Sequence, residues 1–362
     1  MPTKRNTPSP PPLPLNSKPQ LPAQPLAPVQ SLSCMRCYDF SAVDEHASRF
    51  PRHTVSSLQS LAYDLTEPFD TETEKARALF TWLHHNITYD VDAFLSGNLQ
   101  PSTPESTLSS GLAVCDGYAG LFKYLAECVG MQVHKITGHG KGVGYKALEP
   151  GEPLPPMKMN HAWNCILTDG VWRLVDPCWG AGALNITMYV KRFDASWFTS
   201  TPAEFGRRHF PEDPSYQLIA DEDGGPISWE QYMDEPEPGP IIFAQFYEAK
   251  LDPATVQPAS KFIRGGQYVH FSVFKLCEHM STADEDNFVY FVMMENSRTP
   301  LYLNNEGGWS ADVFIPAGAE VALYFVTTVN GQDAKGLGAH GFNAVNGRSA
   351  MQFGGLLKWS PA

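Results

Sequence analysis

The sequence lacks long apolar runs, and it lacks an excess of positive charge. Its 362 residues include 26 Lys and Arg against 39 Asp and Glu, which gives a formal net charge of −13. This balance argues against a protein that binds nucleic acid or anionic membranes through bulk positive charge. The longest apolar runs stay far below the roughly 18 residues that span a bilayer, so we expect no transmembrane segment.

A secretory signal and an even set of cysteines are also missing. The first residues are rich in proline and contain no apolar stretch of the kind that a secretory signal needs. The seven cysteines are an odd number in a long chain, which favours free thiols in a reducing compartment. We therefore expect a cytoplasmic protein.

Motifs for metals and cofactors are scarce. Cys34 and Cys37 have the C-x-x-C spacing of zinc ligands, but a structural zinc site needs four ligands and we find no second pair of this kind. The stretch GHGKGVG at 138–144 lacks the G-x-x-x-x-G-K-[ST] pattern of a phosphate-binding loop, and we expect its glycines to shape a loop beside the functional site. No calcium-loop spacing occurs. We predict neither a bound metal nor a cofactor.

The chain does contain enough apolar sequence for about two folded domains. Hydrophobic residues make up 43% and aromatic residues 12% of the chain, which are globular values. We expect four segments: a disordered Pro-rich tail at 1–38, a core at 39–215, an acidic, solvated Pro/Gly-rich connector at 216–240 and an all-β domain at 241–362. Residues 5–14 of the tail fit the basic-residue-plus-PxxP pattern that SH3 domains bind.

Two helices are predicted in the core. The stretch TETEKARALFTWLHHNI, from 71 to 87, opens with a capping box and then places apolar residues on one helix face. A second helix begins at Cys115 and ends before Gly130. A helix N-terminus lowers the pKa of a cysteine, whereas a buried free cysteine is a small packing residue. Cys115 is therefore either a nucleophile or part of the core, and the choice depends on a base.

A predicted hairpin supplies that base. HAWNCILT and VWRLVD flank Asp169-Gly170, and a two-residue turn there places His161 and Asp176 as diagonal neighbours on one face. A carboxylate beside an imidazole fixes its tautomer and stabilises its charged form. The same register puts Cys178 opposite His161 as a rival thiol, although packing suits a cysteine on a strand better, because a strand lacks the electrostatics of a helix end.

The sequence pattern of the C-terminal region predicts a series of strands. Apolar and aromatic runs alternate with Gly, Pro and Asn turns, which predicts a sandwich-like all-β domain. The runs are IIFAQFYEAKL, QYVHFSVFKL, NFVYFVMMEN and VALYFVTTVNG.

Three motifs in this order and spacing resemble the transglutaminase-like superfamily, a branch of the papain-like cysteine enzymes. They are AVCDGYAGLFKYLAECVG, NHAWNCI and VWRLVDPCWGAG, and EKARALFTWLHHNITYDVDAF adds a resemblance to the kyphoscoliosis peptidase type. The resemblance covers roughly residues 50–215. It implies an α+β papain-like core, in which the helix that begins at Cys115 packs on an antiparallel sheet, followed by a β-sandwich-like domain.

The resemblance also implies a catalytic triad, with Cys115 as nucleophile, His161 as general base and Asp176 as orienting residue. The implied function is cysteine-dependent acyl transfer on protein or peptide amide bonds through a thioester. Hydrolysis is favoured over transglutaminase cross-linking, because cross-linking needs a site that excludes water. The backbone N–H of Cys115 is one expected oxyanion donor, and Trp82 and Gln100 are candidates for the second.

A non-catalytic scaffold is the alternative. The superfamily includes members that have lost their chemistry, and the resemblance points to cytoskeletal or cytokinetic assemblies. In that case the Pro-rich tail and the β-domain recruit partners, and the thiol of Cys115 is not needed.

Overall fold

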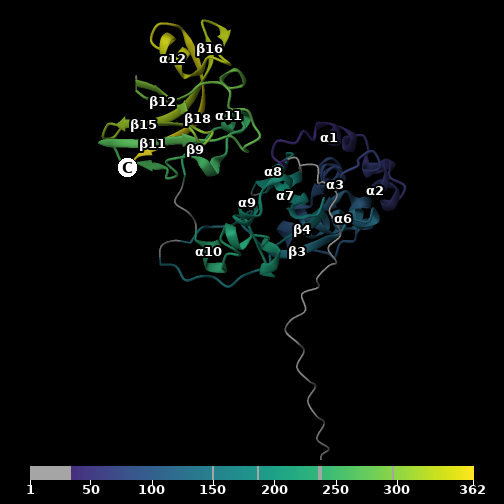
Figure 1. The fold of residues 1–362 in the computed structure, drawn as a ribbon. Coiled ribbons are helices and arrows are strands. Elements are labelled where there is room, and N and C mark those ends of the chain that lie inside the picture. Colours follow the sequence, from purple (N-terminus) through teal and green to yellow (C-terminus); the bar gives the residue numbers. More distant parts are fainter. Residues whose placement is uncertain (1–33, 149–150, 186, 235–238, 296) are drawn as a thin grey trace, which may run out of the picture. The chain divides into compact units, whose positions relative to one another are not determined.

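The computed structural model describes residues 34–148, 151–185, 187–234, 239–295 and 297–362 (Figure 1). The SH3-type motif at residues 5–14 lies outside these ranges. Within them, no helix is both long enough and apolar enough to cross a membrane. The described chain combines helices and sheets in an α+β architecture, as the sequence predicted.

Helices dominate the first part of the described chain. They are α1 (Ser41–Ser48), α2 (Leu58–Thr66), α3 (Glu72–Asn86), α4 (Val91–Ser96), α5 (Pro104–Ser110) and α6 (Cys115–Cys128), with a 3-10 turn at Arg52–Thr54. The Thr71 side chain caps α3 by accepting a hydrogen bond from the Glu74 N–H at 3.1 Å. Helix α6 ends at Cys128, and Gly130 follows in the left-handed conformation, as expected.

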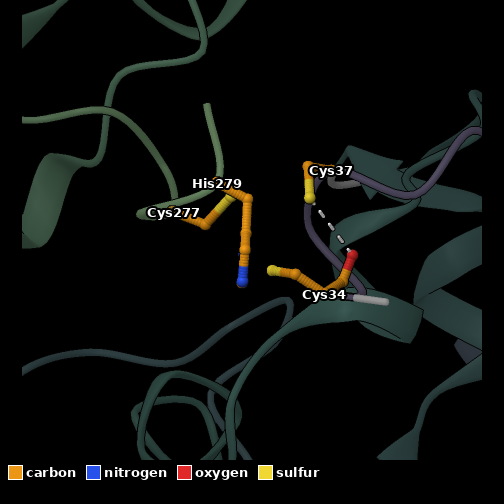
Figure 2. A group of neighbouring side chains, drawn as sticks. All are labelled: Cys34, Cys37, Cys277 and His279. Atoms are coloured by element: carbon orange, nitrogen blue, oxygen red, sulfur yellow. Dashed lines mark hydrogen bonds between the residues drawn. The ribbon is translucent and has the colours of Figure 1, made fainter. Parts of the chain in front are cut away.

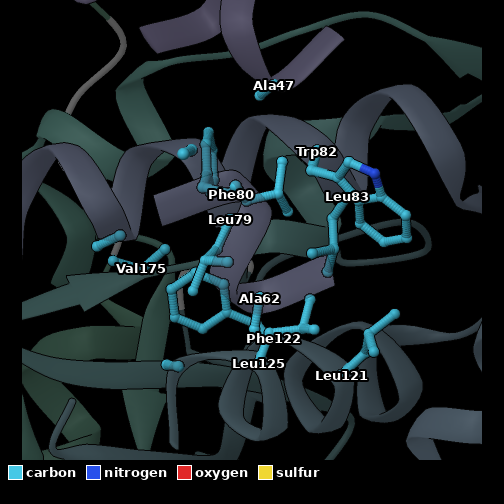
Figure 3. Close-up of a cluster of buried hydrophobic side chains, with 14 of the residues drawn as sticks. Ala47, Ala62, Leu79, Phe80, Trp82, Leu83, Leu121, Phe122, Leu125 and Val175 are labelled. Carbon is cyan, nitrogen blue, oxygen red and sulfur yellow. The ribbon is translucent and has the colours of Figure 1, made fainter. Parts of the chain in front are cut away.

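The apolar faces of α3 and α6 form the centre of the N-terminal core. Leu79 and Phe80 of α3 are fully buried, and so are Phe122 and Leu125 of α6. Figure 3 shows Leu79, Phe122 and Leu125 between the two helices, as the spacing of apolar residues predicted, and Phe80 packs against Phe198. Burial of one such side chain stabilises the fold by about 1.5–3 kcal/mol. This packing fixes the position of the first turn of α6, and therefore of Cys115.

A four-stranded antiparallel sheet packs against α6. Its order is β5-β4-β3-β8, with β3 (Val133–Gly140), β4 (His161–Thr168), β5 (Val171–Val175) and β8 (His209–Pro211). Asp169 and Gly170 join β4 to β5 with φ values of 50° and 79°, the left-handed pair that a two-residue hairpin turn needs. Thr168 pairs with Val171 as the sequence predicted.

The hairpin pairing ends earlier than the sequence suggested. The last pair is Asn164 with Val175, and the chain then turns into the short helix α7 (Pro177–Ala181). Pro177 lacks an N–H for the sheet and favours the first position of a helix. Cys178 is therefore a helical residue, and the prediction that it lies on a strand opposite His161 was wrong.

Short elements complete this part of the chain. They are β1 (Thr88–Tyr89) and β2 (Leu112–Ala113), which pair in parallel, β6 (Gly182–Asn185) and β7 (Met188–Lys191), which pair antiparallel, and the helices α8 (Ser196–Thr199) and α9 (Pro202–Gly206). The β1–β2 pair places Tyr89 beside Ala113, two residues before Cys115.

The acidic segment after residue 215 was expected to be a solvated connector, but part of it is buried. It contains the helix α10 (Trp229–Met233) after two 3-10 turns at Pro214–Gln217 and Asp221–Asp223. Tyr232 and Met233 are buried and share an apolar cluster with Phe210 of β8. The acidic composition hid these apolar positions, which attach the segment to the edge of the sheet.

The C-terminal region is built from two sheets. One has the order β10-β18-β16-β12-β13, with β17 beside β16 and β9 beside β18, and the other has the order β11-β15-β14. The strands are β9 (Ile241–Ile242), β10 (Phe262–Ile263), β11 (Gln267–Val273), β12 (Tyr290–Met294), β13 (Ser297–Pro300), β14 (Tyr302–Leu303), β15 (Trp309–Ile315), β16 (Val321–Val329), β17 (Gln332–Asp333) and β18 (Met351–Pro361). Three of the four predicted strand runs are thus confirmed.

Both sheets contribute side chains to one apolar cluster. Phe271 of β11 and Trp309 of β15 share it with Tyr290 of β12 and Trp359 of β18. The region is sheet-rich but not all-β, because it also holds α11 (Ala244–Glu248), α12 (Gly338–Val345) and 3-10 turns at Pro253–Thr255 and Asp284–Asp286. The run at 241–251 was wrongly predicted to be one strand: β9 is two residues long, and Phe246 of α11 is the apolar anchor.

Candidate active site

Cys115 is the first residue of α6. The residue before it, Val114, caps the helix in an extended conformation and offers no side-chain hydrogen bond. The first N–H groups of a helix have no partner within it, and together they favour negative charge. The Cys115 side chain is half-buried, and it lies where the start of the helix favours negative charge.

His161 and Asp176 form a buried hydrogen-bonded pair. Nε2 of His161, the first residue of β4, lies 2.7 Å from Oδ2 of Asp176, which follows β5. The contact predicted from the hairpin register is therefore present. The other carboxylate oxygen, Oδ1, accepts the backbone N–H groups of Cys178 and Trp179, each at 2.9 Å. Asp176 thus caps α7 and holds the imidazole with the same side chain.

A second histidine, His209, contacts the same carboxylate. Its Nε2 lies 2.9 Å from Oδ2 of Asp176, and its side chain is almost fully buried. Sequence reasoning missed this residue, because it comes from β8, 33 residues after Asp176. Nothing local marks it, since β8 reaches the site only by pairing with β3.

The charges in this cluster depend on the single carboxylate of Asp176, which accepts hydrogen bonds from both imidazoles. Burial opposes a charge on His161, but Asp176 outweighs it and, together with Cys115, raises the pKa of His161 to about 10. Burial lowers the pKa of His209 to about 4, and the charge on His161 adds to this effect. Burial works against the charge of Asp176, but the two histidines hold the pKa of its carboxyl below the usual range. His161 is therefore an imidazolium and His209 is neutral at pH 7.

Cys115 is a further neighbour of His161. A side-chain hydrogen bond and an electrostatic interaction with Cys115 both raise the pKa of His161. The ring is also fixed by Trp179, which stacks on it with centroids 4.4 Å apart and planes at 21°. The structure therefore brings together all three residues that the sequence singled out.

A cavity of about 340 Å³ opens beside the cluster. Its wall includes His161, Trp179, Tyr89, Asn160, Arg192 and Arg208. Cys115 does not line this cavity. Three residues that interact electrostatically with Cys115 do line it, namely His161, Tyr89 and Cys178. The cavity thus reaches the imidazole and the immediate neighbours of the thiol.

Glycines of the GHGKGVG stretch lie directly against the site, as expected. Gly140 ends β3, and its N–H donates to Oδ1 of Asn160 at 2.7 Å. A Cβ at Gly140 would lie 2.9 Å from Cβ of His161, and one at Gly142 would lie 3.1 Å from the Trp179 ring. The chain can pass this close to the imidazole only because side chains are absent there.

Three secondary candidates have other roles. The indole N–H of Trp82 is buried and donates to the carbonyl of Phe50 at 2.8 Å. Gln100 is exposed and donates to the Asn98 side chain. Both groups donate to other acceptors, so these contacts give neither of them the role of second oxyanion donor. Burial raises the pKa of the Cys178 thiol well above its usual value, which agrees with a packing role for that cysteine.

A comparison with known families matches the part of the chain that holds this cluster. Residues 59–177 match the family model of the transglutaminase-like superfamily. The matched segment contains Cys115, His161 and Asp176.

Individual proteins give a finer comparison. The chain is 33% identical over 182 residues to kyphoscoliosis peptidase from Mus musculus, which covers 50% of this chain and 27% of that protein. It is 25% identical over 193 residues to cytokinesis protein 3 from Schizosaccharomyces pombe, over 52% of this chain and 21% of that protein. The match thus spans about a quarter of these relatives. A solved structure of a TGase aligns at 16% identity with a TM-score of 0.27, over 48% of this chain and 40% of that one.

Proposed function

We propose that this protein is a cysteine-dependent acyl-transfer enzyme that acts on amide bonds of proteins or peptides. One observation carries the proposal: the imidazole of His161 interacts with the Cys115 side chain, and its Nε2 lies 2.7 Å from Oδ2 of Asp176. A nucleophile, a base and a group that orients the base are the minimum set for this chemistry. The family of the domain and the relative named a peptidase support it.

The first half-reaction forms a thioester. The Cys115 thiolate attacks the amide carbonyl carbon, and the electron pair of the C=O bond moves to the oxygen. The N–H groups at the start of α6 stabilise this oxyanion. When the C–N bond breaks, His161 gives its Nδ1 proton to the departing amine, because its Nε2 is held by Asp176. The acyl group is left on sulfur.

The second half-reaction removes the acyl group. His161, now neutral, takes a proton from water, and the oxygen attacks the thioester carbon. The C–S bond breaks, a carboxylic acid leaves, and the thiolate–imidazolium pair is restored. We favour water over an amine as acceptor, because the cavity beside His161 is lined by polar Asn160, Arg192 and Arg208 and opens to solvent.

A hydrolysis assay on the full chain tests the proposal. Purified protein is incubated with a mixture of unstructured peptides, and new termini are mapped by mass spectrometry. Cys115→Ala is expected to abolish cleavage, whereas Cys128→Ala, at the exposed end of the same helix, leaves it intact. Cleavage that persists in Cys115→Ala overturns the assignment. If cross-linked peptides form instead of cleavage products, the acceptor of the acyl group is an amine and not water.

A cytoplasmic scaffold of cytoskeletal or cytokinetic assemblies is the second candidate. The relative named cytokinesis protein 3 favours it, and the PxxP pattern at residues 5–14 would supply an SH3 ligand. The two candidates differ in cells. A scaffold tolerates Cys115→Ala but fails when residues 1–33 are deleted, whereas an enzyme fails with Cys115→Ala and tolerates that deletion, which leaves Cys34 and Cys37 in place.

A further inference from the structure

Four ligand-type side chains from distant parts of the chain meet away from the active site. They are Cys34, Cys37, Cys277 and His279, which we call the Cys3His cluster. Their sulfur and nitrogen atoms all lie within 4.8 Å of one another. Figure 2 shows the cysteine side chains and the imidazole pointing toward a common centre. We propose that the Cys3His cluster is a structural zinc site.

The set of donors suits zinc. Structural zinc is held by four ligands, and three cysteines with one histidine are among its usual combinations. Zn–S bonds of about 2.3 Å and Zn–N bonds of about 2.0–2.1 Å in a tetrahedron place the ligand atoms about 3.5–3.8 Å apart. Atoms already within 4.8 Å reach this spacing by closing about 1 Å, which small rotations of the side chains provide.

The backbone on both sides of the cluster forms turns. The N–H groups of Cys37 and Tyr38 donate to the carbonyl of Cys34 at 3.1 and 3.0 Å, and the N–H of Met280 donates to that of Cys277 at 3.2 Å. A turn across C-x-x-C brings two thiols to one side of the chain, which is how such pairs hold zinc. The second pair is C-x-H, and it comes about 240 residues later. The search of the sequence for a second C-x-x-C pair therefore missed it.

Arg36 joins the two halves of the cluster independently of the thiols. It lies between Cys34 and Cys37, and its Nη1 donates to the carbonyl of Leu276 at 2.8 Å and to Oδ2 of Asp252 at 3.1 Å. Glu204 is a second carboxylate partner of the same guanidinium. The residue beside Cys277 is thus held against the C-x-x-C turn by contacts that do not depend on a metal.

The other group of metal-ligand type among the described residues is less suited. It consists of His161, Asp176 and His209, which offer three ligands, and their facing atoms are already hydrogen-bonded to one another. The Cys3His cluster also holds no disulfide, since all seven cysteines are free thiols. The three thiols and the imidazole form no disulfide, so all four side chains can act as metal ligands. Zinc there would tie residues 34–37 to the loop at 277–279.

The test uses the full chain, purified without chelator and analysed for metals by mass spectrometry. About one zinc ion per chain is expected. Replacement of zinc by Co²⁺ should give a thiolate-to-metal charge-transfer band and the intense visible bands of tetrahedral cobalt. Cys277→Ser should lose the zinc, His279→Cys should keep it with four sulfur ligands, and Cys128→Ser, at an exposed cysteine outside the cluster, should bind as the parent does.

A second measurement needs no variant. In the parent protein, Cys34, Cys37 and Cys277 should resist alkylation until a chelator is added and then become labelled together, with the labels mapped by mass spectrometry. A protein that carries no zinc after growth in zinc-supplemented medium overturns the proposal. So does a Cys34–Cys37 disulfide, or zinc that stays in Cys277→Ser and leaves in His209→Gln.

Discussion

The Nε2 atom of His209 lies 2.9 Å from Oδ2 of Asp176. The same oxygen accepts the hydrogen bond of His161 at 2.7 Å, so one buried carboxylate serves two imidazoles. Only one of them carries a charge, because two imidazoliums beside a single carboxylate would repel each other in a site of low dielectric. The neutral histidine sets an acid limit to stability, and the charged one sets an alkaline limit.

The first prediction concerns stability at low pH. The pKa of His209 is lowered by burial to about 4 in the folded chain, against about 6.5 when it is unfolded. Its contribution is therefore fully present above about pH 6.5 and is lost as the pH falls toward 4, since only the unfolded chain binds the proton. The loss reaches about 3 kcal/mol at most. Urea denaturation at pH 7 and 4.5 should show a smaller decrease in unfolding free energy for His209→Gln than for the parent.

The contribution of His161 to stability depends on pH in the opposite direction. Its pKa is raised by Asp176, against the effect of burial, to about 10, so its contribution is full below about pH 6.5 and is lost as the pH rises toward 10. His209→Gln should leave this alkaline decrease unchanged. Equal acid slopes in the parent and in His209→Gln would show that His209 is protonated in the folded chain.

The second prediction concerns the reactivity of Cys115. The imidazolium of His161 stabilises the thiolate, so iodoacetamide should label Cys115 faster below pH 7 than it labels exposed Cys128 in the same chain. His161→Ala should slow the labelling of Cys115 by about tenfold or more, because the neighbouring positive charge is lost. Site-resolved mass spectrometry gives both rates. A thiol that labels no faster than Cys128 contradicts the thiolate–imidazolium pair and favours the scaffold.

The third prediction isolates the charge of Asp176. In Asp176→Asn the side-chain oxygen still accepts from the N–H groups of α7, but the carboxylate that holds His161 is lost. The pKa of His161 should fall, because only Cys115 then opposes the effect of burial, and hydrolysis should drop by about a hundredfold or more. Loss of one partner of a buried pair costs about 3–5 kcal/mol of stability.

A matched control is Asp213→Asn. Asp213 caps a short 3-10 turn by accepting from the Ser215 N–H at 2.9 Å, but it is exposed and no histidine contact accompanies it. This variant should retain the activity and the titration of His161, followed by NMR of the imidazole protons. An unchanged His161 titration in Asp176→Asn would mean that another group holds its charge.

The fourth prediction tests the close passage of the chain at Gly140. A methyl group there would lie 2.9 Å from Cβ of His161, so Gly140→Ala should displace the imidazole and cost about 1–3 kcal/mol. The labelling rate of Cys115 should fall with it. Gly120→Ala is the control, because a Cβ at this α6 position meets no atom within 4 Å and alanine stabilises a helix. Similar melting temperatures and labelling rates in the two variants would contradict the contact.

Much of the site was determined by local sequence. The Thr71 cap and the apolar period specify α3. The apolar period specifies α6, and thereby the placement of Cys115 at a helix N-terminus. Asp169 and Gly170 specify a two-residue turn, and the two-residue alternation of strands then brings His161 to Asp176. These relationships depend on neighbours within about 20 residues, where backbone geometry alone sets which side chains meet.

Other features were decided only by the tertiary structure. His209 reaches Asp176 because β8 pairs with β3, and Cys277 reaches Cys37 across about 240 residues. The run at 241–251 has the composition of a strand but becomes α11, since the burial of Phe246 outweighs local propensity. Sheet order and long loop closure follow from how the whole chain buries its apolar surface, and no local pattern records that outcome.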